Sequence, residues 1–215
     1  MTLNYVKEDF SYLKVAGITE IAFPMLCFCD IPTDRIAPHL ELYGSYGIGF
    51  RKQWGVGEKG MQLVHYLSSG SQFTHDLREA LALSIRQSEQ IADAGLATLS
   101  DFLVTVLAYA KPDHGMNKGQ DRWFQDECEW RYIPREGELP PGMPYMIGKP
   151  TKTELDNYRK TLWRPETFKL AFEYKDVVAL FAPAGEDQEK LRELIGDLNA
   201  TEEEKKHLIA CIKEA

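Results

Sequence analysis

The chain has 215 residues, of which 44% are hydrophobic, so it is long and apolar enough to bury a sizeable core. Its formal net charge of −8 repels free nucleic acid on average, and binding would need a local basic patch. The best cluster of basic residues is Arg51-Lys52, with Lys59 further on. This cluster is small, so composition gives little support for nucleic-acid binding.

The sequence also argues against a membrane or secreted protein. Its first segment, MTLNYVKEDF, is polar and charged and does not resemble a secretory signal. The most apolar window, Ile91 to Ala110, contains Asp93 and Asp101, and its uninterrupted apolar part, Phe102 to Ala110, is too short to span a bilayer. We therefore expect a buried helix there and a cytoplasmic protein.

The four cysteines do not predict a metal site. Cys27 and Cys29 flank Phe28, and this C-x-C spacing, with no second pair after it, is not that of a zinc knuckle. Cys128 and Cys211 stand apart from them. We expect buried, reduced cysteines that pack as small apolar side chains, and no bound metal.

In chain order, the first part of the sequence predicts short strands around one helix. The expected elements are a buried strand at Phe23–Phe28, a short helix from Asp30 to Leu42 with Gly44 as its stop, a strand at Tyr46–Arg51, a turn at Gly55–Gly60 and a strand at Met61–Leu67.

The second part predicts a helical insertion and further strands. Residues 68–110 have helical periodicity, which we interpret as an insertion at about 72–110 divided by Gly95. After it we expect a strand at Trp123–Ile133, an irregular loop at Arg135–Lys149, a helix capped by Thr151 and Glu154, strands at Phe168–Phe172 and Val177–Phe181, a helix at Glu186–Leu198, and a last helix capped by Thr201 and Glu204. The sequence therefore predicts one α+β domain over residues 1–215 with a mostly antiparallel sheet.

The stretch ELYGSYGIGF raises the first question about function. Gly47 and Gly49 are two residues apart, so in a strand they leave one face bare, while Tyr46, Ile48 and Phe50 line the other. Such glycines mark a bulge or the close approach of another backbone or a ligand. Tyr43, Tyr46 and Phe50 pack in a core, or one of the tyrosines stacks on a planar ring that Gly47 or Gly49 allows to come close. Neither a dinucleotide motif nor a P-loop is present.

A second candidate lies in the stretch DECEWRYIP. In the predicted strand, Glu127, Glu129 and Arg131 share one face. They form either a solvent-facing edge of mixed charge or a carboxylate site in a cleft. In the second case Glu129 stabilises a positive charge or orients a hydroxyl, and Glu127 assists.

Three stretches in fixed order, IAFPMLCFCDIP, YGSYGIGF and WFQDECEWRYIP, together resemble the AbiGi family of abortive-infection phage-resistance proteins. The tail FKLAFEYKDVVALFAP also fits, and the similarity covers about residues 20–182. The resemblance implies a bacterial defence or toxin–antitoxin context. In that context the chain would act as the antitoxin-like member of a two-gene system, with a cognate toxin or antitoxin as its partner.

An aromatic–glycine strand followed by an E-x-E strand is also similar to the pattern of ADP-ribosyltransferases. That similarity implies a split antiparallel sheet with NAD lying across it. Tyr46 would stack on the nicotinamide, and Glu129 would be the catalytic glutamate, with Glu127 orienting the acceptor nucleic acid or protein. The further NAD-binding candidates would be Gly47, Gly49, Arg51 and Arg131.

The sequence departs from that pattern at its start. Such enzymes usually open with a strand bearing a His or Arg that grips the NAD ribose, and MTLNYVKEDF has neither. Either His39, His65 or Arg51 substitutes, or the chain is not catalytic. Three hypotheses follow: an NAD-dependent transferase, a non-enzymatic antitoxin or adaptor that binds a partner toxin, and a protein whose motifs are architectural. The transferase hypothesis requires Glu129 and Gly47 on opposite walls of one cleft.

Overall fold

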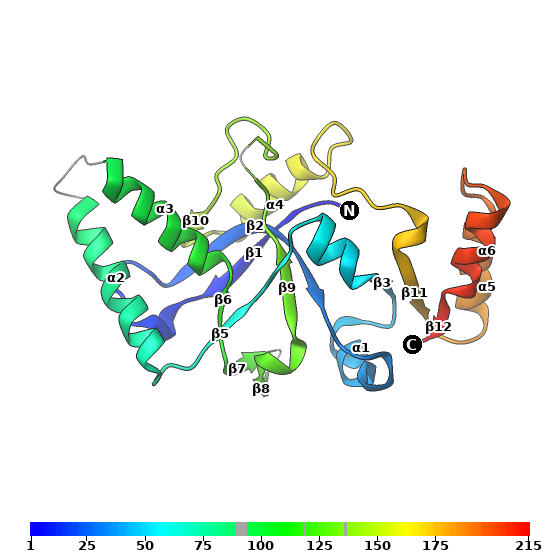
Figure 1. Ribbon diagram of the computed structural model, residues 1–215, viewed down its shortest axis with the longest axis horizontal. Coiled ribbons are helices and arrows are strands. Elements are labelled where there is room, and N and C mark those ends of the chain that lie inside the picture. Colours follow the sequence, from blue (N-terminus) through cyan, green and yellow to red (C-terminus); the bar gives the residue numbers. More distant parts are fainter. Residues whose placement is uncertain (89–93, 118, 136) are drawn as a thin grey trace. The chain divides into compact units, whose positions relative to one another are not determined.

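A computed structural model describes residues 1–88, 94–117, 119–135 and 137–215 (Figure 1). The described residues form an α+β protein with mostly antiparallel strand pairing, as the sequence predicts. The chain divides into two compact units. Unit 1 comprises Met1–Asp30 and Gln62–Leu170, and unit 2 comprises Ile31–Met61 and Ala171–Ala215. A single domain over residues 1–215 stays a prediction.

Unit 1 is built on a five-stranded antiparallel sheet. Its strands are β1 (Asn4–Asp9), β2 (Glu20–Cys29), β4 (Gln62–Leu63), β9 (Glu129–Tyr132) and β10 (Ile147–Gly148). The order is β1-β2-β9-β4, and β10 also pairs with β2. The long strand β2 pairs with β1 through its first part and with β9 through its last four residues. The apolar run predicted at Phe23–Phe28 is therefore a central strand, whereas β1 was not expected from its polar sequence.

Helices and small strands complete unit 1. They are α2 (Gln72–Ser88), α3 (Ala94–Ala108), α4 (Lys152–Leu162), the parallel pair β5 (His65–Leu67) and β6 (Ala110–Pro112), and the hairpin β7 (His114–Asn117) and β8 (Gln120–Trp123). The predicted helical insertion is confirmed as α2 and α3. Gly95 lies inside α3 rather than between the helices, and residues 89–93, which include Ile91 and Asp93, lie outside the described residues.

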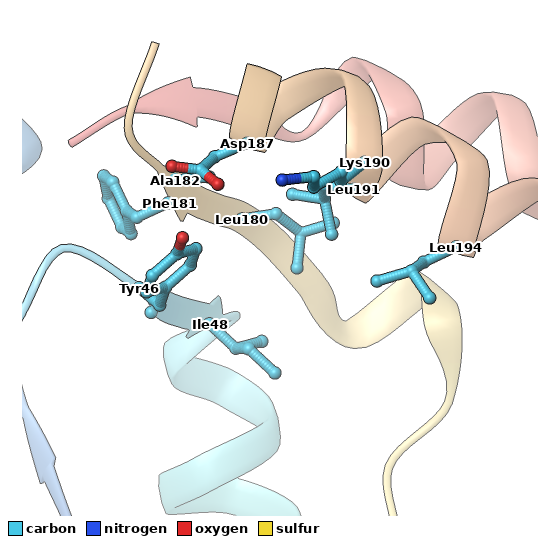
Figure 2. Close-up of a pocket in the computed structure, with 10 residues that line it drawn as sticks. Tyr46, Ile48, Leu180, Phe181, Ala182, Asp187, Lys190, Leu191 and Leu194 are labelled. Carbon is cyan, nitrogen blue, oxygen red and sulfur yellow. The ribbon is translucent and has the colours of Figure 1, made fainter. Parts of the chain in front are cut away.

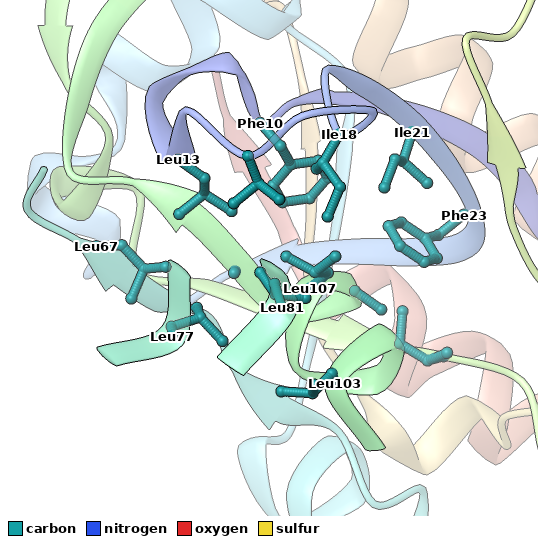
Figure 3. Close-up of a cluster of buried hydrophobic side chains, with 14 of the residues drawn as sticks. Phe10, Leu13, Ile18, Ile21, Phe23, Leu67, Leu77, Leu81, Leu103 and Leu107 are labelled. Carbon is teal, nitrogen blue, oxygen red and sulfur yellow. The ribbon is translucent and has the colours of Figure 1, made fainter. Parts of the chain in front are cut away.

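The helical insertion and the sheet of unit 1 share one hydrophobic core (Figure 3). Both helices contribute leucines four residues apart, which places each pair on one helical face. The core side chains drawn and labelled there are Phe10, Leu13, Ile18, Ile21, Phe23, Leu67, Leu77, Leu81, Leu103 and Leu107. Among the described residues, no helix is both long and apolar enough to cross a membrane.

Unit 2 contains a smaller, mixed sheet with the order β12-β11-β3. Its elements are α1 (Ala37–Tyr43), β3 (Gly47–Phe50), β11 (Val177–Ala182), α5 (Glu186–Gly196), α6 (Glu202–Ala210) and β12 (Ile212–Glu214). Strand β11 pairs antiparallel with β3 and parallel with β12. Val177 packs with Ile195, Leu208 and Cys211 in a small core between the sheet and the helices α5 and α6.

Both predicted capping boxes are present. The Thr151 hydroxyl accepts a hydrogen bond from the Glu154 backbone N–H at the start of α4, and Thr201 and Glu204 repeat the arrangement at α6. In each box the glutamate side chain accepts a hydrogen bond from the backbone N–H of the threonine. Both helices therefore begin where the sequence predicts.

Two predicted elements are wrong, and a third, the strand at Trp123–Ile133, is only partly formed. Residues 168–172 are not a strand, although Leu170 N–H donates to the Met1 carbonyl at 2.8 Å and the Met1 amine donates to the Leu170 carbonyl at 2.7 Å. The predicted turn at Gly55–Gly60 is replaced by a π-helical turn at Trp54–Glu58. The Trp54 side chain is buried in it and stacks on Phe50 with ring centroids 4.7 Å apart.

Candidate functional site

Unit 1 contains a group of charged side chains that are buried or largely buried, which we call the charge cluster: Glu8, Lys111, Glu127, Glu129 and Arg131. They come from β1, β6, a 3-10 turn at Phe124–Glu127, and β9. Burying charge is costly unless each ion is paired. The pairing within the cluster therefore decides what it can do.

Arg131 lies at the centre of the cluster and has no exposed surface. Its Nε donates to Glu129 Oε1 at 2.7 Å, its Nη1 donates to the Ala108 carbonyl at 2.7 Å, and its Nη2 donates to Glu8 Oε1. Each of the three guanidinium nitrogens is thus engaged within unit 1. The guanidinium ties β1, β9 and the end of α3 together.

Lys111 is the second cation. Its Nζ donates to Glu127 Oε2 and to Glu129 Oε2, both at 2.9 Å, and lies 4.8 Å from the centre of the Phe124 ring. Glu129 therefore uses one oxygen for Arg131 and the other for Lys111. Its backbone N–H also donates to the Tyr66 hydroxyl at 2.8 Å.

Burial and these contacts together shift the pKa values of two carboxyl groups in opposite directions. Burial by itself would raise the pKa of Glu129, but the charges of Arg131 and Lys111 outweigh it and hold that pKa at about 2. For Glu8, burial outweighs the same two cations and raises the pKa. The cluster has three carboxyl groups and two cations. A proton on Glu8, which its raised pKa favours, would remove the excess negative charge.

The local backbone differs from the single strand predicted at Trp123–Ile133. The chain leaves β8 at Trp123 and forms the 3-10 turn, and Cys128 follows with a left-handed conformation, φ 43°. Only Glu129 and Arg131 share a strand face, whereas Glu127 reaches Lys111 from the turn. The interpretation as a solvent-facing edge is wrong, since Glu127, Glu129 and Arg131 are all buried.

Sequence reasoning missed two members of the cluster. Glu8 is 123 residues from its partner Arg131, and Lys111 follows the helical insertion. No local pattern marks either residue. The available signal was indirect. The predicted strand carries Glu127 and Glu129 but only one cation, Arg131, so burial of both acids requires a further cation.

In unit 2, the bare face of the glycine strand is filled by the neighbouring strand. A side chain added at Gly49 would place its Cβ 3.0 Å from Ala179 Cβ, and one added at Gly47 would lie 3.4 Å from the Phe181 ring. Ala179 and Phe181 are the cross-strand partners of these glycines. The sequence predicted either a bulge or the close approach of a backbone or ligand at these glycines, and the structure shows the close approach of strand β11.

The aromatic residues near this strand divide into two groups. Phe50 is partly buried against Trp54 and Phe172. The other two, Tyr43 and Tyr46, are 49% and 68% exposed, so the expectation that they pack in a core is wrong. Arg51 forms an ion pair with the buried Asp176 of the same unit.

The predicted site residues thus form two sets. Glu127, Glu129 and Arg131 belong to the charge cluster of unit 1, together with Glu8 and Lys111. The second set, in or beside β3 of unit 2, is Tyr46, Gly47, Gly49 and Arg51. Of the substitutes considered for gripping ribose, His39 lies in α1 and His65 in β5. A cleft shared by Glu129 and Gly47 stays a prediction.

The cysteines differ from expectation. Cys27, Cys29 and Cys128 are exposed, and only Cys211 is buried. Cys27 and Cys29 lie in the part of β2 that pairs with β9, and Cys128 directly precedes β9. In the described parts of the chain, no group of three or more His, Cys, Asp or Glu could hold a metal ion.

Unit 2 also has an open groove, which we call the apolar groove (Figure 2). It has a volume of about 360 Å³. One side is formed by β3, the other by α5, and β11 lies between them. The lining residues are Tyr46, Gly47, Ile48, Leu180, Phe181, Ala182, Asp187, Lys190, Leu191 and Leu194.

The fold and these two features define an α+β protein with a buried ion cluster in one unit and an exposed apolar groove in the other. The family model described as "Putative abortive phage resistance protein AbiGi, antitoxin" matches residues 1–183. A relative from Lactococcus lactis subsp. cremoris, "Abortive phage resistance protein AbiGi", is 31% identical over 210 residues, which cover 87% of this chain and 84% of the relative.

The chain therefore belongs to the AbiGi family, as the three ordered sequence stretches indicated. Neither description mentions ADP-ribosyl transfer. No solved structure matches the chain significantly.

Proposed function

We propose that this chain is a non-enzymatic antitoxin of a phage-defence system and that it binds a partner toxin. The family description as an antitoxin supports this function. The observation that carries the proposal is the state of Glu129, the residue on which a transferase would depend. Its side chain is 6% exposed, and its two oxygens bind Arg131 and Lys111.

A transferase glutamate has to contact the substrate, where it stabilises the developing sugar cation or accepts a hydrogen bond from a hydroxyl. Glu129 has its oxygens committed to two protein cations, and its pKa of about 2 makes it a weak base at neutral pH. These properties are those of a structural ion pair. They favour partner binding over catalysis as the activity of this chain.

The second candidate function is an NAD-dependent ADP-ribosyltransferase that modifies a nucleic acid or protein. It is favoured by the convergence of Glu127 and Glu129 on one lysine, since clusters of buried ionisable groups are common in active sites. In this hypothesis Glu129 is catalytic, Glu127 orients the acceptor, and Arg131 assists NAD binding. Tyr46, Gly47, Gly49 and Arg51 would hold NAD.

Expression in a bacterial host separates the two functions. We expect the chain alone to be harmless, to relieve growth arrest when it is expressed with the toxin of its two-gene system, and to co-purify with that toxin. A chain that arrests growth by itself, with Glu129→Gln restoring growth, would support the transferase instead. Circular dichroism of Glu129→Gln is needed, because an unfolded variant would also be harmless.

Labelled NAD gives an independent measurement. The purified chain and the Glu129→Gln variant are incubated with host extract, and transfer of label to protein and nucleic acid is measured. We expect no label above background from either. Label that appears with the wild-type chain and disappears with the folded variant would refute the non-enzymatic proposal.

A further inference from the structure

We propose that the apolar groove of unit 2 is the surface that binds the toxin, and that it receives an amphipathic segment bearing apolar side chains next to Lys or Arg. This inference rests on the proposed antitoxin function and names its binding site. The groove has walls from two different elements and an exposed apolar lining, and the helix that forms one wall carries more acidic than basic residues.

The two walls present regular rows of side chains. Tyr46 precedes β3 and Ile48 lies within it, two residues apart, so both project from the same face. From α5, the residues Asp187, Lys190, Leu191 and Leu194 have the spacing i, i+3, i+4, i+7, which places them along one side of a helix. Figure 2 shows the two rows facing one another across β11.

The lining is apolar and open. Tyr46, Ile48 and Leu194 are 68%, 52% and 64% exposed, and they meet in one groove rather than being scattered. Single exposed apolar residues are ordinary, but a group with polar residues at its rim is typical of a binding surface. A groove whose lining is this exposed is suited to side chains of another protein.

The charge on the helix that forms one wall selects the partner. Helix α5 contains four acidic and two basic residues, a net charge of −2, and one of its acids, Asp187, lines the groove. At the rim, Asp187 lies beside the Tyr46 hydroxyl (Figure 2), and Lys190 pairs with Glu186 at 2.7 Å. A cationic partner segment would meet complementary charge here, which aids both specificity and the rate of association.

Leu194→Asp is the principal test, with binding to the purified toxin measured by calorimetry. Because a central apolar contact is replaced by a charge, we expect Kd to rise about tenfold or more. Phe102→Asp is the matched control: Phe102 is 61% exposed on α3 of unit 1, and we expect its replacement to change Kd by less than about threefold. Higher salt should weaken the wild-type complex.

A second measurement keeps the test independent of folding defects. A photo-crosslinking benzoylphenylalanine at Tyr46 keeps an aromatic ring at the groove, and the same group at Phe102 is the control. We expect a crosslink to the toxin from position 46 and none from position 102.

The outcomes distinguish this inference from the function on which it rests. A wild-type chain that neither binds the toxin nor relieves arrest refutes both. Wild-type binding that is unchanged in Leu194→Asp, or lost in Phe102→Asp instead, refutes the groove alone. Loss of self-association in Leu194→Asp, measured by ultracentrifugation with no change in toxin binding, would identify the groove as a contact between two copies and also refute this inference.

Discussion

The charge cluster and the apolar groove place side chains in opposite ways. The charge cluster of unit 1 has three buried and two largely buried charged side chains, whereas unit 2 leaves tyrosine, isoleucine and leucine side chains exposed around one groove. Buried charge and clustered exposed apolar surface are the two departures from ordinary burial that carry information. Their consequences differ: the first is compensated inside its own unit, and the second has no such compensation. Substitutions in the cluster should therefore change stability, and substitutions in the groove should change binding.

The largest effect is expected for Arg131→Met. The variant keeps an apolar stem but leaves Glu8 and Glu129 without the cation that pairs them. Removing one partner of a buried ion pair costs about 3–5 kcal/mol, a large part of the stability of a typical domain. Urea unfolding followed by circular dichroism measures the change.

The control is the triple variant Glu8→Gln, Glu129→Gln, Arg131→Met, which removes the unpaired charges together with the cation. We expect it to be more stable than Arg131→Met alone, because no isolated buried charge remains. If Arg131→Met unfolds at the wild-type urea concentration, the cluster does not stabilise unit 1, and the contrast between the two regions fails.

Acid unfolding should show the contribution of Glu129. Its pKa is about 2 in the folded chain against an ordinary value of 4.5. A carboxylate with a lowered pKa contributes stability that is complete above pH 4.5 and is lost as the pH falls toward 2. This contribution is at most about 3 kcal/mol. The raised pKa of Glu8 acts in the opposite sense, because its proton uptake favours the folded chain as the pH falls.

The measurement is the urea midpoint between about pH 5 and pH 2. We expect a decline in the wild-type chain and a shallower decline in Glu129→Gln, which has no proton to take up at that position. Equal slopes in the two proteins would mean that Glu129 has an ordinary pKa and is not held by Arg131 and Lys111.

Contacts in the charge cluster could be predicted only between residues that are close in the sequence. The period of two in a strand places Glu129 and Arg131 on one face, and their contact agrees with it. Glu8 and Lys111 join through tertiary pairing, which no local pattern encodes. The 3-10 turn before Cys128 was missed for a related reason, since a left-handed cysteine has no clear sequence signal.

The same distinction applies to unit 2. The spacing of Gly47 and Gly49 predicts a bare strand face, but which group fills it depends on the register with β11, and hence on Ala179 and Phe181. The helix at α5 was predictable from its pattern. The sequence could not predict which of Leu194 and Ile195 faces the core. The packing of α5 against β11 and α6 buries Ile195 and leaves Leu194 exposed.

Substitutions of Gly47 and Gly49 should change stability by an intermediate amount. Gly49→Ala would bring a Cβ to 3.0 Å from Ala179 Cβ, so the strands must separate slightly, at a cost of about 1–3 kcal/mol. Gly47→Ala meets the Phe181 ring at 3.4 Å, an ordinary contact, and should change stability by less than about 1 kcal/mol. Thermal unfolding of the two variants compares them directly. An equal effect at both positions would show that contact with β11 does not explain the glycines.

The smallest effect on stability is expected for Leu194→Asp, the variant expected to weaken toxin binding most. Its side chain is 64% exposed, so replacing it removes little buried apolar area, and the free energy of unfolding should stay within about 0.5 kcal/mol of the wild-type value. Urea unfolding under the conditions used for Arg131→Met gives the comparison. A loss of about 2 kcal/mol or more would mean that Leu194 packs against the rest of the chain. The apolar groove would then be part of the interior. Like the charge cluster, it would contribute to stability, and its exposed side chains would no longer indicate a binding surface.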